Sequence, residues 1–133
     1  MIALDPRRER DYITSADRDL PEDQQTTLRL RTLPESVMVE IMDSVRVSTN
    51  DDGDAEVSQA GVGTRTRTIL RHGLTGWSNF KNGDGSDVPF EASNGAASDD
   101  SLGRIPWDAK IELANAVEAT GRMTEDEVEK PEQ

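Results

Sequence analysis

A shortage of large apolar side chains limits what this chain can fold into. Of its 133 residues, 33% are hydrophobic and 4% are aromatic, whereas apolar residues make up about 45–50% of an ordinary soluble domain. One of the two tryptophans and both phenylalanines fall within the segment His72–Phe90. We therefore expect this segment to hold a small core together, and we expect neighbouring molecules to complete what the chain cannot bury alone.

The predicted core gathers the large apolar side chains of this segment and of the next helical one. Its members are Leu74, Trp77, Phe80, Phe90, Trp107 and Ile111. Burial of one large apolar side chain stabilises a fold by about 1.5–3 kcal/mol. With so few rings available, we expect the loss of Trp77 or Phe80 to unfold the domain.

Charge and composition argue against several classes of function. The chain carries 27 acids and 15 basic residues, a net charge of −12, which opposes binding to nucleic-acid phosphates and to anionic membranes. It has no cysteine, which excludes disulfides and thiolate metal sites. The sequence shows neither the apolar run of a membrane span nor that of a signal peptide. We expect a soluble protein with no nucleic acid, membrane, cofactor or small-molecule partner.

The charges are unevenly distributed along the chain. The stretch Val57–Gly83, named here the basic segment, contains no acid but carries Arg65, Arg67, Arg71 and Lys81. Thirteen acids follow in the remainder of the chain. We therefore expect the basic segment to attract the acidic half, within one molecule or between copies. The alternative is that both faces are simply solvated.

The first half of the chain contains four recognisable patterns. Residues 1–25 show no helical or strand period, which predicts an extended N-terminal arm. Thr26–Leu33 alternates leucine and arginine, which indicates a half-buried strand at a sheet edge. Pro34 suits a first helical turn, and apolar residues at helical spacing predict a helix as far as Val45. Residues 48–63 are small, acidic and glycine-bearing, which is typical of a flexible loop.

The second half predicts two helices around an aromatic segment. The first helix is expected to end at Gly73 in a left-handed cap. A tight aromatic turn over Gly76–Phe80 and an extended segment Val88–Phe90 follow it. Pro106 opens the last helix. Its buried face is expected to carry Trp107, Ile111, Ala114 and Val117.

These patterns together predict an α+β fold. The body is expected to contain two or three helices and a short antiparallel sheet near residues 26–33 and 88–90. It forms one domain over residues 26–121, between the N-terminal arm of residues 1–25 and an acidic C-terminal tail of residues 122–133.

No set of residues in the sequence indicates catalysis. His72 is the only histidine, and no serine motif accompanies it, so we expect a helix-end residue rather than a catalytic base. A calcium-loop spacing between Phe80 and Glu91 fails because phenylalanine occupies its first ligand position. We therefore predict no enzymatic activity, no metal and no cofactor.

Contacts with partner proteins are the predicted role of the exposed cations. Arginine suits interfaces because its planar guanidinium pairs with carboxylates through two hydrogen bonds. The candidates in the arm and the basic segment are Arg7, Arg8, Arg10, Tyr12, Arg65, Arg67 and Arg71. For the basic segment, the expected partner surface is acidic.

Several motifs in the chain resemble those of small late proteins of tailed bacteriophages. The pattern is a helix ending in Gly-Leu, then GW-x-NF, DG, VPF, IP and finally ELANAV. Here these motifs are Gly73-Leu74, Gly76-Trp77, Asn79-Phe80, Asp84-Gly85, Val88-Pro89-Phe90, Ile105-Pro106 and Glu112 to Val117. The resemblance covers about Thr26 to Glu129, and its motifs are structural rather than catalytic.

The resemblance implies a role in phage morphogenesis. We expect a virion protein that contacts other phage structural proteins, and copies of itself, in the head or at the head-to-tail junction. One alternative is a tail assembly chaperone that is absent from the mature particle. A second alternative is an acidic protein that binds a basic host factor.

Overall fold

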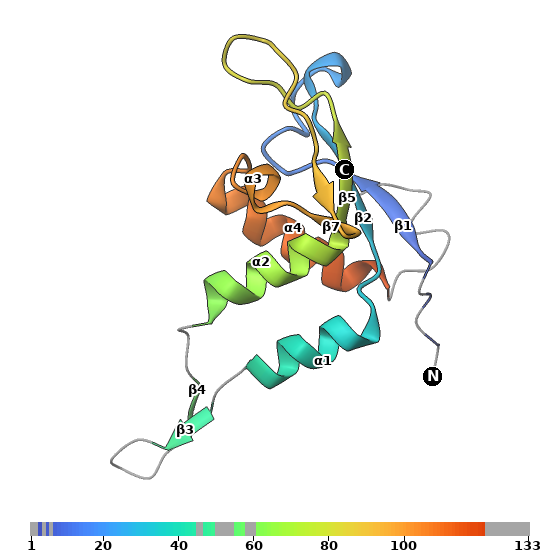
Figure 1. Cartoon of the computed structure of the whole chain (residues 1–133). Helices are drawn as coiled ribbons and strands as arrows, with labels where there is room; N and C mark the ends of the chain where they lie inside the picture. The colour runs from blue at the N-terminus through green and yellow to red at the C-terminus, as the bar shows by residue number, and fades with distance from the viewer. Residues whose placement is uncertain are drawn as a thin grey trace.

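The computed structural model describes residues 3, 5, 7–44, 47–49, 55–57 and 61–121. Figure 1 shows helices packed against one side of a small antiparallel sheet. The predicted α+β class is confirmed. The α-helices in the described part are α1 (Glu35–Ser44), α2 (Val62–Gly73), α3 (Asp99–Leu102) and α4 (Trp107–Thr120).

The strands form one central sheet and two short hairpins in the described part of the chain. The central sheet has the order β1-β2-β5 and is antiparallel, with β1 at Glu9–Tyr12, β2 at Thr27–Arg31 and β5 at Leu74–Ser78. The hairpins pair β3 (Val47–Thr49) with β4 (Ala55–Val57), and β6 (Ala92–Ser93) with β7 (Ala96–Ala97). A 3-10 turn, η1, covers Glu22–Gln24.

The N-terminal segment belongs to the body, which corrects the prediction of an arm over residues 1–25. Strand β1 pairs with β2, so that Arg10 lies opposite Leu30 and Tyr12 opposite Leu28. The alternation of buried and exposed residues in β1 was hidden because one of its two inward residues is an arginine. Strand β2 is therefore central, and its predicted edge position is wrong.

The partner of β2 on its other side is β5, not the predicted segment Val88–Phe90. The stretch read as an aromatic turn is thus largely a strand. Helix α2 does end at Gly73, but the next residue, Leu74, is extended with φ −97°, and Gly73 is not left-handed. This glycine is needed for packing instead, because an added Cβ would lie 2.3 Å from Cγ1 of Val117.

The core is mainly aliphatic and lies between the central sheet and helices α2 and α4. Its fully buried side chains are Leu30, Ile69, Leu70, Leu74, Leu113, Val117 and Thr120. Trp77 packs edge-to-face on Phe80 and Phe90, with both centroid distances 4.9 Å, and this aromatic group is partly buried against the aliphatic core. The rings therefore cover the core rather than fill it.

Helix α4 buries a different face from the predicted one. Trp107 is 48% exposed and Ile111 is 40% exposed, so neither belongs to the core. The buried residues of α4 are Leu113, Ala114, Ala116, Val117 and Thr120. The predicted and the observed faces share Ala114 and Val117. Successive residues of a helix are about 100° apart, so the two faces differ by a small rotation about the helix axis. The spacing of apolar residues in this alanine-rich helix does not decide between them.

Regular structure occurs within the predicted flexible loop and within a second segment that is rich in small residues. Within residues 48–63, the hairpin strands β3 and β4 and the first residues of α2 are described, and residues 50–54 and 58–60 lie outside the described part. Residues 92–103 hold the β6–β7 hairpin and α3, with Asn94 and Gly95 at positive φ in the turn. The predicted acidic tail of residues 122–133 lies outside the described residues.

Candidate protein-binding surface

Arg10 joins the N-terminal strand to the end of α4. Its Nε donates to Oγ1 of Thr120 at 3.1 Å, and its Nη2 donates to the main-chain oxygen of Ala116 at 3.0 Å. A cation here also offsets the negative end of the helix dipole. Because Arg10 is buried by this arrangement, the prediction that it contacts a partner is wrong.

Tyr12 likewise lies in the interior, which overturns its predicted partner role. Its hydroxyl donates to Oε2 of Glu112 at 2.7 Å and accepts from Nη2 of Arg18 at 2.9 Å. Ser15 donates to the same carboxylate through its N–H at 2.9 Å and its hydroxyl at 2.8 Å. The segment after β1 is therefore tied to α4 through Glu112.

This network shifts the pKa values of both titrating partners. Burial, followed by the hydrogen bond to Glu112, raises the pKa of Tyr12 to about 12. Partial burial opposes ionisation of Glu112, but hydrogen bonds from Tyr12 and Ser15 and the charge of Arg18 hold its pKa below the ordinary value. The ionised carboxylate is therefore the form that the fold stabilises.

Arg7 and Arg8, the other two candidates from the predicted arm, precede β1. Arg7 is exposed, and its N–H donates to Oδ1 of Asp5 at 3.0 Å. Arg8 is half-buried, lies 3.9 Å from Asp5 through Nε, and accepts at its main-chain oxygen from the N–H of Thr32 at 2.9 Å. Arg7 is therefore exposed to solvent, whereas Arg8 is partly integrated into the fold.

The cations of the basic segment mostly pair within the molecule. Arg65 forms an ion pair with Glu118 on α4, and Arg71 donates to Asp99 on α3 at 2.8 Å. The hydrogen bond from Arg71, followed by its charge, lowers the pKa of Asp99. The predicted attraction between the basic segment and the acidic half thus operates inside one molecule.

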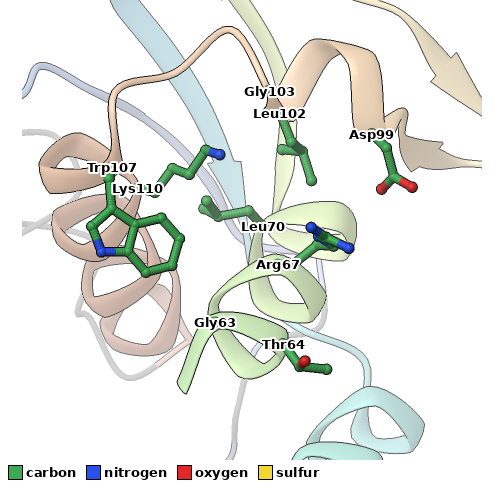
Figure 2. Close-up of a pocket in the computed structure, with 9 residues that line it drawn as sticks. All are labelled: Gly63, Thr64, Arg67, Leu70, Asp99, Leu102, Gly103, Trp107 and Lys110. Carbon is green, nitrogen blue, oxygen red and sulfur yellow. The ribbon is translucent and has the colours of Figure 1, made fainter. Parts of the chain in front are cut away.

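Arg67 lies on the wall of an open cleft between α2, α3 and α4, named here the α2–α4 cleft. The cleft has a volume of about 300 Å³, and its floor includes the buried residues Leu70 and Leu102. Figure 2 shows Trp107 and Lys110 on one wall and Arg67 on the other. The Lys110 ammonium lies 5.7 Å from the centroid of the Trp107 ring, within cation–π range.

A glycine and a tryptophan face each other in the lining of the cleft. Gly63 lies in the first turn of α2, and an added Cβ there would be 3.8 Å from Cη2 of Trp107. Pro106 caps α4, so Trp107 is its first residue and projects from the helix start rather than into the core. Sequence reasoning missed the cleft because its walls come from three separate segments.

A second hollow lies between residues 14–17, strand β2 and α4. Its volume is about 360 Å³, and its largest apolar lining residues include Leu28, Phe80 and Ile105. Carboxylates of Asp17, Asp108 and Glu112 also line it. Glu112 is engaged by Tyr12 and Ser15, as described above, so this hollow follows from how the N-terminal segment docks on α4.

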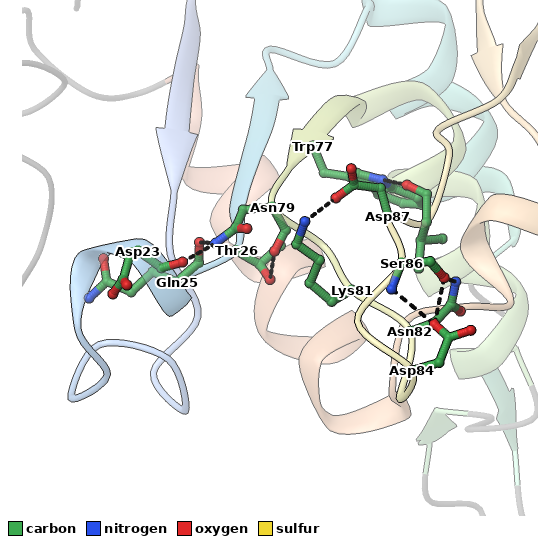
Figure 3. A network of polar contacts seen from close by, with 11 residues as sticks. Asp23, Gln25, Thr26, Trp77, Asn79, Lys81, Asn82, Asp84, Ser86 and Asp87 are labelled. Carbon is green, nitrogen blue, oxygen red and sulfur yellow. Dashed lines mark hydrogen bonds and ion pairs between the residues drawn. The ribbon is translucent and has the colours of Figure 1, made fainter.

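A further polar network fixes the loop before β2. The side chain of Asn79, which has φ 59°, donates to the main-chain oxygens of Asp23 at 2.8 Å and Gln25 at 3.0 Å. Thr26 donates through Oγ1 to the main-chain oxygen of Asn79 at 3.0 Å (Figure 3). Trp77 donates through Nε1 to the oxygen of Val88 at 2.7 Å. The GW-x-NF motif therefore organises the surrounding loops.

Within the described ranges, no group of three or more histidine, cysteine or acidic side chains is arranged to hold a metal ion. No helix in that same part of the chain has the length and apolar character needed to cross a membrane. No family model, curated protein or solved structure matches the chain.

Proposed function

We propose that this chain is a non-enzymatic structural protein of a tailed bacteriophage that makes protein–protein contacts in the head or at the head-to-tail junction. The observation that carries the proposal is Trp107, which is 48% exposed beside the α2–α4 cleft. A chain with two tryptophans leaves one of them on its surface. Tryptophan and arginine are enriched at the energetic centres of protein interfaces.

The electrostatics of the cleft also favour binding over catalysis. Its one carboxylate, Asp99, is paired with Arg71 and has a lowered pKa, so it is poorly suited to accept a proton near neutral pH. Arg67 and Lys110 line the cleft as cations beside the indole ring. An apolar floor with a charged rim is the usual composition of a protein interface.

The phage assignment is supported by the resemblance of the motifs, and the fold gives those motifs a shared structural task. Trp77 contacts Phe80 and Phe90, and Asn79 holds the loop before β2. The motif residues therefore stabilise the fold of the chain. Contacts with a partner then depend on residues outside the motifs, such as Trp107.

The test is quantitative mass spectrometry of purified particles of the phage that encodes this chain. We expect a fixed stoichiometry relative to the major capsid protein. Absence from particles, combined with co-purification with tail proteins from infected cells, would instead identify a tail assembly chaperone. Absence from both particles and assembly complexes would reject the morphogenesis role and favour binding to a host factor.

A further inference from the structure

We propose that the α2–α4 cleft of one copy binds the acidic loop of a second copy, with Leu20 as the inserted side chain. The acidic loop is defined here as residues 19–23, which read DLPED. This inference rests on the contact role proposed above and names the partner of the same site. Repetition of this contact would join the acidic loop of each copy to the cleft of the next copy.

The acidic loop presents an apolar side chain surrounded by acids. Leu20 is 40% exposed and is one of the few large apolar side chains on the described surface. Asp19, Glu22 and Asp23 are exposed around it, and no basic residue lies in the last turn of η1. The loop therefore combines an apolar anchor with a local negative charge.

The α2–α4 cleft is complementary to this loop in shape and charge. Its volume is about 300 Å³, which is ample for a leucine side chain. Trp107, Leu70 and Leu102 provide apolar contact. Arg67 and Lys110 provide positive charge, because the one acid of the cleft is already paired with Arg71.

The acidic loop is held in a defined shape before it binds. The N–H of Leu20 donates to the oxygen of Asp17 at 3.0 Å, and Nε2 of Gln25 donates back to the oxygen of Leu20 at 3.0 Å. Asn79 fixes the end of the loop through Asp23. A preorganised segment loses little conformational entropy on docking, so a small contact becomes sufficient.

The loop and the cleft of one molecule lie apart. In Figure 1, the turn η1 is at the top of the view, whereas the start of α2 and the α3 label lie lower, on the left. A contact between two different surfaces is heterologous, so repetition builds a ring when the rotation closes and a filament when it does not. Such a ring suits a head-to-tail junction.

The first experiment is sedimentation of the purified chain at concentrations up to about 1 mM, where weak heterologous contacts are populated. We expect concentration-dependent association of the natural sequence. Leu20→Ser and Trp107→Ala should each weaken it by about tenfold or more, as for central interface residues. Met42→Ser is the matched control, because Met42 is 68% exposed on α1 and lies outside the proposed contact.

Mixing two variants tests the head-to-tail geometry. The Leu20→Ser variant keeps an intact cleft, and the Arg67→Glu/Lys110→Glu variant keeps an intact loop. We expect each to stay monomeric and their equimolar mixture to form a one-to-one complex and nothing larger. All substituted side chains in these variants are at least partly exposed, and circular dichroism of each variant verifies the fold.

Three outcomes would overturn the proposed contact: a natural sequence that stays monomeric up to about 1 mM, association unaffected by Leu20→Ser, or a mixture that stays monomeric. None of these outcomes bears on the proposed virion role, which is tested by mass spectrometry of purified particles. Conversely, a chain that associates through the cleft but is missing from particles would retain this contact and lose the proposed function.

Discussion

The substitution Gly73→Ala probes a close approach in the core, between the end of α2 and the last turn of α4. The new Cβ would lie 2.3 Å from Cγ1, 2.9 Å from Cγ2 and 3.1 Å from Cβ of Val117. Contacts under 3.0 Å force a shift, and Val117 cannot escape by rotating because both its methyl groups and its Cβ are involved. Overpacking of this kind costs about 1–3 kcal/mol.

An opposing effect reduces the net loss. Alanine is favoured over glycine in a helix by up to about 1 kcal/mol. Gly73 is the last residue of α2, so only part of that gain applies. We expect the free energy of unfolding to fall by about 1–2 kcal/mol, a sizeable share of the about 5–15 kcal/mol typical of a domain.

Urea unfolding of four proteins measures this effect: the natural sequence, Gly73→Ala, Val117→Ala and the double variant. Val117→Ala alone is expected to be destabilising because it leaves a cavity. In the double variant the added methyl occupies part of that cavity, so its loss should be smaller than the sum of the single losses by about 0.5–3 kcal/mol. Additive losses, or a Gly73→Ala variant as stable as the natural sequence, would refute the proposed steric conflict.

Four further predictions concern the N-terminal strand, the pH dependence and the two tryptophans. Arg10→Met should lower the free energy of unfolding by about 2–3 kcal/mol in urea titrations, because two hydrogen bonds from a charged donor are lost while desolvation of the guanidinium is relieved. The pKa of Glu112 is lowered in the folded state, so its ionised carboxylate stabilises the fold at pH values above the unfolded-state pKa of about 4.3. This contribution is lost as the pH falls through the folded-state pKa. In Glu112→Gln, the free energy of unfolding should therefore change less with pH over that range. Trp77→Ala should cost about 3–5 kcal/mol and weaken the near-ultraviolet circular dichroism signal, because the ring packs on Phe80 and Phe90 and donates to the oxygen of Val88. Trp107→Ala should leave the melting temperature within a few degrees of the natural value, because its ring is half-exposed.

The sequence predicted the elements whose apolar spacing is regular. Helix α1 begins one residue after Pro34, as proline at a helix start suggests, and the buried Val37 and Ile41 lie on the predicted stripe. The α2 boundary at Gly73 was also predictable, since a glycine follows a run of helical residues. These features depend on neighbours in the sequence.

The features that the sequence did not predict depend on distant neighbours. Strand β1 was missed because Arg10 faces inward, and an inward arginine is acceptable only when the end of α4 receives its hydrogen bonds. Trp107 is exposed because α4 is oriented so that Leu113 is buried in the core. Spacing within α4 cannot choose between adjacent faces that share an alanine and a valine.

The hydrogen bond between Arg10 and Thr120 joins residues that are 110 positions apart in the chain. During synthesis, Arg10 therefore leaves the ribosome well before its partner. Translation at about 5–20 residues per second places about 5–20 s between the emergence of these two side chains from the ribosome. During that interval β1 lacks the two α4 oxygens that accept hydrogen bonds from its inward-facing Arg10. Strand β1 can therefore complete its contacts only after α4 has been synthesised, and a polypeptide truncated before α4 should remain open to proteolysis at its N-terminal end.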